Sequence, residues 1–282
     1  MSRNGQSRRS TNPDDYQRVP RALVAMPKDF TSGFEILPHT HYRAQLIYAT
    51  AGTMRVSTDE GMWIVPPQRA LWMPGGVRHG IVMLGDVTMR TLYLKTDAAP
   101  FMPAACHVLP VTPLLRELIV RATELPVRYD EQGPAGHVMA LILAELRGLQ
   151  SLPLQLPIPR DARLRTLCQA LLKAPGDQQP LAAWATRLNA STRTLARRFH
   201  RETGLSFGAW RQQARVLEAM GRLGAGEAVT KVAFDLGYES VSAFSAMFRR
   251  AAGTPPSHYR RRPQVDLQSP SLSGDLRGFA TP

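Results

Sequence analysis

The chain has 282 residues, enough for two domains with separate cores, and 44% of its residues are hydrophobic, which is ordinary for a globular protein. It contains no run of eighteen apolar residues that could cross a membrane, and the first residues, MSRNGQSRRS, lack the apolar core of a signal peptide. Its two cysteines, Cys106 and Cys168, lie in different halves of the chain and do not suggest a disulfide framework. We therefore expect a soluble protein of the reducing cytoplasm, without a membrane partner.

The formal net charge of +13 is concentrated in the C-terminal part of the chain. Residues 160–262 hold 18 Lys or Arg against 7 Asp or Glu, whereas residues 21–159 are nearly balanced, with 12 against 11. A basic domain joined to a neutral one indicates that only one half of the protein binds a polyanion.

The N-terminal half shows the pattern of a small β domain. Residues 1–20 are polar and without periodicity, which predicts a disordered tail. Residues 21–110 then contain short apolar runs broken by Gly and Pro, such as LIYATAG, MWIVPP and ALWMPGG. Strands of five to seven residues at regular spacing predict an all-β barrel or jelly roll.

Residues 111–150 change to helical periodicity, in Pro113–Pro126 and Gly136–Leu149. These apolar helices either form a dimer interface or only cover the barrel. The proline-rich residues 151–160 follow and predict a semi-rigid linker.

The C-terminal half contains an internal repeat of a two-helix unit, in Leu181–Gly204 and again in Lys231–Arg260. In each unit an apolar helix ends at a residue that tolerates a left-handed backbone, Asn189 or Gly237, and a serine then caps a second helix. This arrangement predicts a helix-turn-helix, although one such unit alone could also be a plain helical hairpin. The apolar pairs that should be buried are Leu195 with Phe199 and Phe244 with Phe248.

A longer helix should connect the two units, from Ser206 to about Arg222. At about 1.5 Å per residue it would span roughly 25 Å. With its flanking turns it could hold the two recognition helices about 34 Å apart, one turn of DNA. The tail after the second unit, residues 263–282, is rich in Pro, Ser and Gly and should be disordered.

The repeat, the connecting helix and the ending GYESVSAFSAMFRRAAGTPPSHYR resemble the DNA-binding domain of the AraC/XylS family of bacterial transcription regulators, over residues 161–262. The resemblance implies an all-α domain with two helix-turn-helix units that binds double-stranded promoter DNA, as an activator or a repressor. It also implies a small-molecule effector, contact with RNA polymerase and a homodimer. Members commonly carry Arg where this chain has Ala246, so we expect the second unit to contact fewer bases.

Both recognition helices present candidate DNA contacts. Arg193 and Arg197 should contact bases, because an Arg in the first half of a recognition helix can bind guanine with two hydrogen bonds. The later arginines should contact phosphates, which position the protein without specifying sequence. A charged face that is merely solvated is the alternative. The predicted set is Thr192, Arg193, Ala196, Arg197, Arg198 and Arg201 in the first unit, and Ser242, Ala243, Ala246, Arg249 and Arg250 in the second.

The β domain carries a second motif, His39-x-His41-x3-Gln45-x6-Gly52 followed by Pro74-x-Gly76-x2-His79, which resembles the two sequence motifs of cupins. In metal-binding cupins the matching positions hold one divalent ion with two His, a Glu and a third His. Gln45 stands at the Glu position here. Three imidazoles and an amide could still hold a metal, although losing the carboxylate lowers affinity. The alternative is a metal-free pocket in which His39, His41, Gln45 and His79 hydrogen-bond an effector.

Four aromatic residues could line an apolar effector pocket beside this motif or simply belong to the core. They are Tyr48, Trp63, Trp72 and Tyr93.

The sequence therefore predicts an α+β multidomain protein, with a cupin-like jelly roll and helices followed by the double helix-turn-helix domain. The expected function is a transcription regulator whose effector changes the balance between two arrangements of the domains. A metal-dependent cupin enzyme with a helical appendage is the alternative, but the basic repeat and Gln45 argue against it. We expect no enzyme activity.

Overall fold

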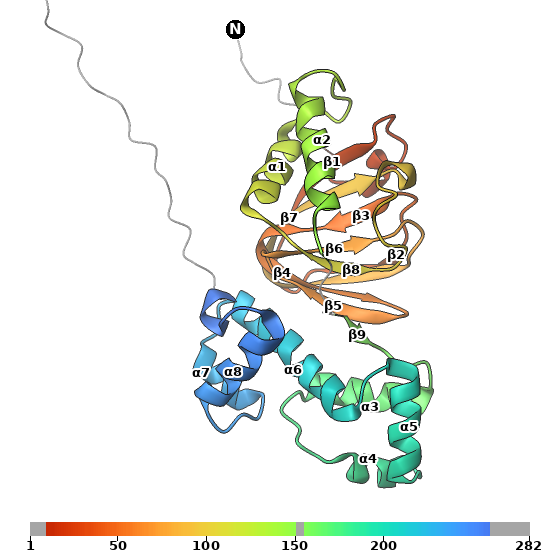
Figure 1. The fold of residues 1–282 in the computed structure, drawn as a ribbon, viewed down its shortest axis with the longest axis vertical. Helices are drawn as coiled ribbons and strands as arrows, with labels where there is room; N and C mark the ends of the chain where they lie inside the picture. Colours follow the sequence, from red (N-terminus) through yellow and green to blue (C-terminus); the bar gives the residue numbers. More distant parts are fainter. Residues whose placement is uncertain (1–9, 151–154, 260–282) are drawn as a thin grey trace, which may run out of the picture.

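The computed structural model of the protein describes residues 10–150 and 155–259 (Figure 1). A β domain and a helical domain follow one another along the chain, as predicted from the sequence. The predicted tail 263–282 lies outside the described residues, as do residues 1–9 of the predicted N-terminal tail.

Residues 10–20 are ordered, so the prediction of a disordered tail is wrong for them. They contain a 3-10 helix (Pro13–Tyr16), and the ring of Tyr16 is buried. The guanidinium of Arg43 explains their position, because it is buried and donates hydrogen bonds to the backbone oxygens of Gln17, Val19 and Arg21. A buried cation requires such acceptors, and here the N-terminal segment supplies them.

The described strands form a nine-stranded sheet that curls around its own core (Figure 1). Its organising strand is β7 (His79–Leu94), which pairs antiparallel with β1, β2, β3 and β4. The remaining strands are β1 (Leu23–Phe30), β2 (Glu35–His39), β3 (Ala44–Ile47), β4 (Ala49–Thr58), β5 (Gly61–Val65), β6 (Arg69–Met73), β8 (His107–Pro110) and β9 (Leu156–Pro157).

The two faces of the sheet bury different sets of side chains, because successive residues of a strand point to opposite sides. In β3, Ile47 points into the barrel, whereas Leu46 joins the core on the other face with Tyr48, which follows the strand. Two helices, α1 (Pro113–Glu124) and α2 (Pro134–Arg147), cover that other face.

The C-terminal domain contains six α-helices within the described residues. None of the described helices has the length and apolar character needed to span a membrane. The six helices are α3 (Ala162–Lys173), α4 (Leu181–Arg187), α5 (Thr192–Thr203), α6 (Phe207–Gly224), α7 (Val229–Asp235) and α8 (Val241–Ala252).

The turns and caps of both helix-turn-helix units are as predicted. Asn189 has φ 48° and Gly237 has φ 81°, so both adopt the left-handed backbone. The hydroxyls of Ser191 and Ser240 accept hydrogen bonds from backbone N–H groups three residues later, and Ser206 caps α6 in the same way.

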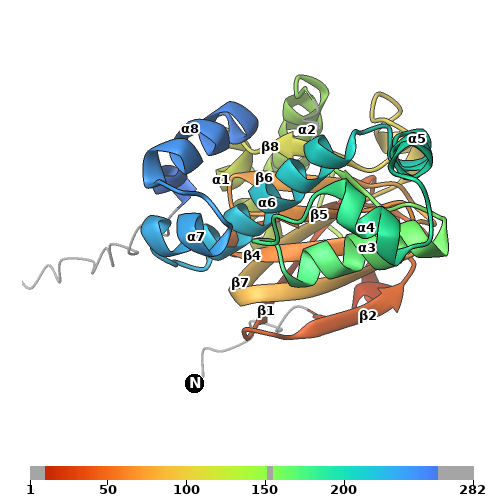
Figure 2. The ribbon, with the colours of Figure 1, turned by 90° about the horizontal axis from the view of Figure 1, so that it is seen from below.

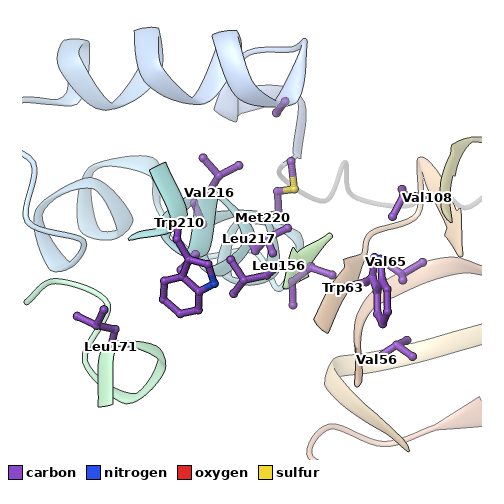
Figure 3. Packing of buried hydrophobic residues seen from close by; sticks show 14 of the residues in the cluster. Val56, Trp63, Val65, Val108, Leu156, Leu171, Trp210, Val216, Leu217 and Met220 are labelled. Carbon is purple, nitrogen blue, oxygen red and sulfur yellow. The ribbon is translucent and has the colours of Figure 1, made fainter. Parts of the chain in front are cut away.

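The long helix α6 packs against the outer face of the sheet at β4 and β5 (Figure 2). Small residues allow this approach, since a Cβ built on Gly221 would lie 3.0 Å from the side chain of Leu84. Hydrophobic contacts continue from one domain into the other. Figure 3 shows Leu156 of β9 between Leu217 of α6 and Trp63 of β5, all three being buried.

Strand β9 lies within the segment that the sequence predicts as a linker. Leu156 and Pro157 pair with Met62 and Gly61 of β5, and the backbone oxygen of Pro157 accepts a hydrogen bond of 2.8 Å from the Trp210 indole. The described part of this segment therefore joins the domains by specific contacts, which proline content alone does not reveal.

Candidate functional site

The recognition helix of the first unit, α5, separates an apolar face from a basic one. Leu195 and Phe199 are buried against the domain core, where the Phe199 ring contacts Trp210 edge-on at a centroid distance of 5.9 Å. Arg193 and Arg197 lie on the opposite, exposed face, as the helical spacing predicts. All predicted contacts of this unit are exposed: Thr192, Arg193, Ala196, Arg197, Arg198 and Arg201.

The four arginines of α5 are electrostatically available. Among the described residues none of them forms a salt bridge, whereas Arg222 and Arg90 elsewhere are paired with carboxylates. Exposed arginines without carboxylate partners on one face of a helix can bind the phosphates and base edges of DNA.

The second recognition helix, α8, has a different exposed face. Phe244 and Phe248 are fully buried, and Ser242, Ala243 and Ala246 are exposed in its first half. Its exposed cations, Arg249 and Arg250, lie in the last turn. The structure thus places every predicted residue of this unit on the surface, with charge only at the C-terminal end of the helix.

In the β domain, the three histidines of the cupin-like motif come together although 40 residues separate His39 from His79. One ring nitrogen from each lies within 4.8 Å of the others, and His39 Nε2 and His41 Nε2 are 2.9 Å apart. Strand pairing brings these histidines together, because His39 lies directly opposite His79 in the antiparallel pair of β2 and β7.

Backbone contacts orient these rings. Nδ1 of His39 lies 2.8 Å from the Leu37 oxygen, and Nδ1 of His79 lies 2.9 Å from the Val77 oxygen. Carbonyl oxygens only accept, so both Nδ1 atoms carry the proton and each Nε2 presents a lone pair, which in His39 is directed at the Nε2 of His41. Nε2 of His79 is buried without a hydrogen-bond partner among the described residues.

Burial keeps two of the imidazoles neutral at physiological pH. It lowers the pKa of His41 to about 4, with the neighbouring His39 and His79 acting in the same direction. Burial also lowers the pKa of His79 to about 4, although its hydrogen bond to Val77 acts in the opposite direction. Neutral imidazole is the form that binds a metal or accepts a proton from a ligand.

Gln45 lies beside the histidines with its side-chain oxygen available. Its Nε2 donates to the Thr91 hydroxyl at 3.0 Å, and that hydroxyl donates its own proton to the Leu46 oxygen at 3.0 Å. This chain of donors fixes the orientation of the amide. The Gln45 oxygen is buried without a partner in the described part of the chain, so it is free to accept a hydrogen bond or to bind a metal ion.

These residues fit a divalent metal. Histidines that bind metals usually donate their other ring N–H to a carbonyl oxygen or a carboxylate, as His39 and His79 do here, and the Gln45 oxygen could serve as a fourth ligand. Ligand nitrogens around one zinc ion lie roughly 3.3 Å apart, given Zn–N distances of about 2.0 to 2.1 Å. The three ring nitrogens lie within 4.8 Å of one another, so they would have to move closer around a bound ion.

A cavity of about 400 Å³ opens beside this cluster. Of the four aromatic residues proposed for an effector pocket, Tyr93 lines this cavity, whereas Tyr48 and Trp72 lie in the core beneath α1 and α2 and Trp63 is buried outside the lining. The lining combines histidines and amide with apolar side chains and a few charges at Asp14, Lys28 and Glu35. Its residues are Pro13, Asp14, Met26, Lys28, Phe30, Phe34, Glu35, Ile36, Leu37, His39, Thr40, His41, Gln45, Ile81, Met89 and Tyr93.

The sequence reasoning missed the apolar wall of this pocket. Ile81 lies two residues after His79 in β7, and Met89 lies four residues before Tyr93 in the same strand. Residues separated by an even number of positions along a strand lie on the same face, so the sequence could have predicted that Ile81 and Met89 lie on the same face as His79 and Tyr93. Pro13 and Asp14 carried no such signal, because they reach the pocket through the tertiary position of the N-terminal segment.

Two family models match the chain, an AraC-like ligand-binding domain over residues 31–188 and a helix-turn-helix domain over residues 184–262. The transcriptional regulator NimR of Escherichia coli is 34% identical over 224 residues, which cover 79% of this chain and 82% of NimR. The regulator RipA of Corynebacterium glutamicum is 35% identical over 103 residues, covering 36% of this chain and 31% of RipA. Among solved structures, ToxT from Vibrio cholerae aligns over 84% of this chain and 96% of its own, at 10% identity and a TM-score of 0.36.

Proposed function

Because the chain belongs to the AraC family of helix-turn-helix transcription regulators, we propose that it binds promoter DNA through α5 and α8 under the control of an effector bound in the 400 Å³ cavity. The observation that supports this most directly is the exposed basic face of α5, whose arginines form no salt bridge with any residue that the structure describes.

The two recognition helices have different roles in this proposal. Arg193 and Arg197 contact base edges, because they lie in the first two turns of α5, where a recognition helix meets the major groove. Arg249 and Arg250 contact phosphates and anchor α8, whose first half presents only small side chains. The first unit therefore supplies most of the sequence specificity.

The effector occupies the cavity between the histidine cluster and the apolar wall of Phe30, Ile81 and Met89. We propose that His39, His41 and His79, with the Gln45 oxygen, hold a divalent metal there. When bound, the metal supplies a Lewis-acidic contact for an oxygen or nitrogen atom of the effector. The apolar wall contributes hydrophobic contact, and Tyr93 borders both regions.

The effect of a bound effector is transmitted to the DNA-binding domain through the contact between α6 and the sheet. Phe34 lines the cavity, and its backbone oxygen accepts from the Met83 N–H at 3.0 Å. The next residue, Leu84, lies against Gly221 of α6. An effector that favours one packing of this contact shifts the population of domain arrangements.

We propose a homodimer formed through α1 and α2. Leu114 and Leu141 are 53% and 51% exposed, although both helices bury other apolar side chains, Leu115 and Ile119 in α1 and Met139, Ile142 and Leu146 in α2. Exposed leucines on two adjacent helices suit a self-complementary interface. RNA polymerase is a further expected partner. Because its main partner is DNA, we expect the protein to act in the cytoplasm.

We do not assign an enzymatic reaction to the histidine cluster. A cupin enzyme would use such a site for catalysis, but the proteins that resemble this chain in sequence are transcriptional regulators. The cavity belongs to a chain whose second half presents a basic double helix-turn-helix, and this combination favours a sensor.

The test begins with selection of bound sequences from random double-stranded DNA by the full chain. Protection of the selected site from nuclease is then measured with and without a panel of small molecules. A defined sequence that is protected at moderate salt supports the proposal, as does a compound that changes the protection. Binding that is equal for all sequences, or absent, would reject sequence-specific regulation.

A further inference from the structure

The loop between α3 and α4, residues 174–180, is fastened to α6 by two arginines. Arg215 donates to the backbone oxygens of Pro175 at 2.9 Å and Asp177 at 3.0 Å, and Arg211 donates to the Gln179 oxygen at 2.9 Å. Burial lowers the pKa of the Arg215 guanidinium. A partly buried cation requires hydrogen-bond acceptors, and the loop carbonyls supply them. The loop is therefore held along one side of α6 at three points.

The same loop contacts the turn of the second helix-turn-helix unit. Gln178 Nε2 donates to the Gly237 oxygen at 2.8 Å. The backbones also touch, because a Cβ built on Gly176 would lie 2.4 Å from the Asp235 oxygen. Gly237 is the left-handed turn residue of that unit, so the loop lies against the point that sets the direction of α8.

Arg215 connects this contact to the core of the second unit. Its guanidinium lies 5.9 Å from the centre of the Tyr238 ring, and that ring packs edge-on against Phe244 of α8 at 5.4 Å. One arginine of α6 thus contacts both the loop and the residue that follows the turn.

Two connections therefore join the helix-turn-helix units. The first is the covalent one through α6, with α5 before it and α7 after it (Figure 2). The second is the α3–α4 loop, which leads directly into α4 of the first unit at Leu181 and touches the turn of the second. Each unit also packs on α6, the first through Phe199 against Trp210 and the second through α7 and α8. The loop adds a contact between the units that lies away from α6, and this contact further restricts the rotation of one unit against the other.

We propose that the α3–α4 loop fixes the separation and rotational phase of α5 and α8, so that the chain accepts its two half-sites at only one spacing. Arg215 and Gln178 are positioning residues for this specificity, since both act at the contact between the units and not on the DNA face. The proposal rests on the proposed function, because it assumes that both helices enter the major groove.

The geometry of DNA makes the spacing measurable. One base pair added between half-sites moves the second by about 3.4 Å and turns it by roughly 34°, since a turn of about 34 to 36 Å holds 10 to 10.5 base pairs. A rigid pair of helices cannot follow both changes. Two recognition helices joined by a flexible connection could adjust to the changed spacing with little loss of affinity.

The experiment uses the full chain and the DNA site that it selects from a random library. Affinity is measured for that site, for versions with one base pair inserted or deleted between the half-sites, and for a site that keeps only the first half-site. The proteins are the wild type, Arg215→Met, Gln178→Ala and the control Gln212→Ala, an exposed residue on α6.

We expect the wild type and Gln212→Ala to lose about tenfold in affinity on the shifted sites, comparable with one or two mismatched base pairs. Gln178→Ala and Arg215→Met should lose most of this discrimination while binding the single half-site as the wild type does. Because Gln178 is exposed, its variant tests the idea even if Arg215→Met folds poorly.

Two results would overturn the proposal: a wild type that binds shifted and unshifted sites equally, or a Gln178→Ala variant that discriminates as the wild type does. If no DNA is selected, the proposed function fails, and fixed spacing fails with it. If the chain selects only a single half-site, and binds longer sites with the same affinity, the fixed spacing is rejected while the proposed DNA-binding function stands.

Discussion

Gly224 of α6 lies so close to Thr53 of β4 that a Cβ built on the glycine would be 2.2 Å from the threonine Oγ1. The contact joins the helix between the two DNA-binding units to the sheet that surrounds the effector cavity. We expect Gly224→Ala to push α6 away from the sheet and lower the free energy of unfolding by about 1 to 3 kcal/mol, the range for overpacking. It should also weaken the effect of an effector on DNA affinity.

The matched control for this change is Gly208→Ala in the same helix, where an added Cβ meets nothing within 4 Å. That variant should gain about 0.5 to 1 kcal/mol, because alanine is the better helix former. Urea titration of both variants gives the comparison. Equal stability changes would show that the contact at Thr53 is not tight.

Arg197→Ala tests base contact by α5. It should cost about 1 to 3 kcal/mol on the selected DNA site and much less on random DNA, because a bidentate contact with guanine discriminates by that amount. Fluorescence anisotropy at fixed salt measures both affinities. Arg121→Ala, an exposed arginine of α1, is the control. Equal weakening on both DNAs would show that Arg197 contacts phosphate.

Metal binding is tested by changing Gln45. Gln45→Glu should tighten the binding of Zn²⁺ or a similar ion, because it adds a negatively charged carboxylate to the ligand set. Without metal the same variant should be less stable than the wild type, since the carboxylate is buried. Melting curves with chelator and with metal separate the two effects.

Elemental analysis of the purified full chain should find about one equivalent of metal in the wild type. The metal should be lost in His79→Ala and kept in His107→Ala, whose ring lies outside the cluster. A wild type without metal, and unable to bind added metal, would leave the cavity as a metal-free hydrogen-bonding pocket.

The interface between the domains should respond to pH through Glu218. Burial raises the pKa of this carboxyl, although Arg222 and Arg55 act in the opposite direction. A raised folded-state pKa means that folding favours the protonated form. Stability from this group is therefore full below the ordinary pKa of 4.5 and declines as the pH rises through the folded-state value.

Glu218→Gln should accordingly raise the melting temperature at pH 7.5, and the gain should vanish as the pH falls below that ordinary pKa. Glu227→Gln is the opposite case, because the hydrogen bond from Arg222 lowers the pKa of Glu227. That substitution should lower the melting temperature at pH 7.5. A Glu218→Gln variant less stable than the wild type at pH 7.5 would show that the attraction of the Glu218 carboxylate to Arg222 and Arg55 outweighs its burial.

The proposed dimer is tested by Leu141→Arg. The side chain is half exposed, so the monomer should fold normally, but a charge at the centre of a dimer interface is unfavourable. Light scattering after size-exclusion chromatography should show a dimer for the wild type and a monomer for the variant. A wild-type monomer at micromolar concentration would contradict the proposed interface.

Features set by neighbouring residues could be predicted from the sequence. The left-handed turns at Asn189 and Gly237 and the caps at Ser191 and Ser240 depend on local backbone chemistry, and the structure confirms them. The meeting of the three histidines was also predictable, but only through the resemblance to cupins, since no local rule brings His39 to His79.

Aromatic residues in strands show the limit of this reasoning. Tyr48 and Trp72 face the covering helices instead of the cavity, and composition gives no information about which face of a curled sheet becomes the inside. The Arg43 contacts that hold residues 10–20 against the barrel were equally invisible, because their acceptors are backbone oxygens, which every sequence has.

By itself, the sequence determined the two-part architecture, the helix-turn-helix repeat and the basic face of α5, because periodicity, capping and charge act over a few residues. Only the tertiary structure decided where the cavity lies, that α6 packs on the sheet at Thr53 and Leu84, and that the α3–α4 loop touches the turn at Gly237. These contacts join residues far apart in the chain, and their geometry depends on how whole elements pack rather than on any local preference.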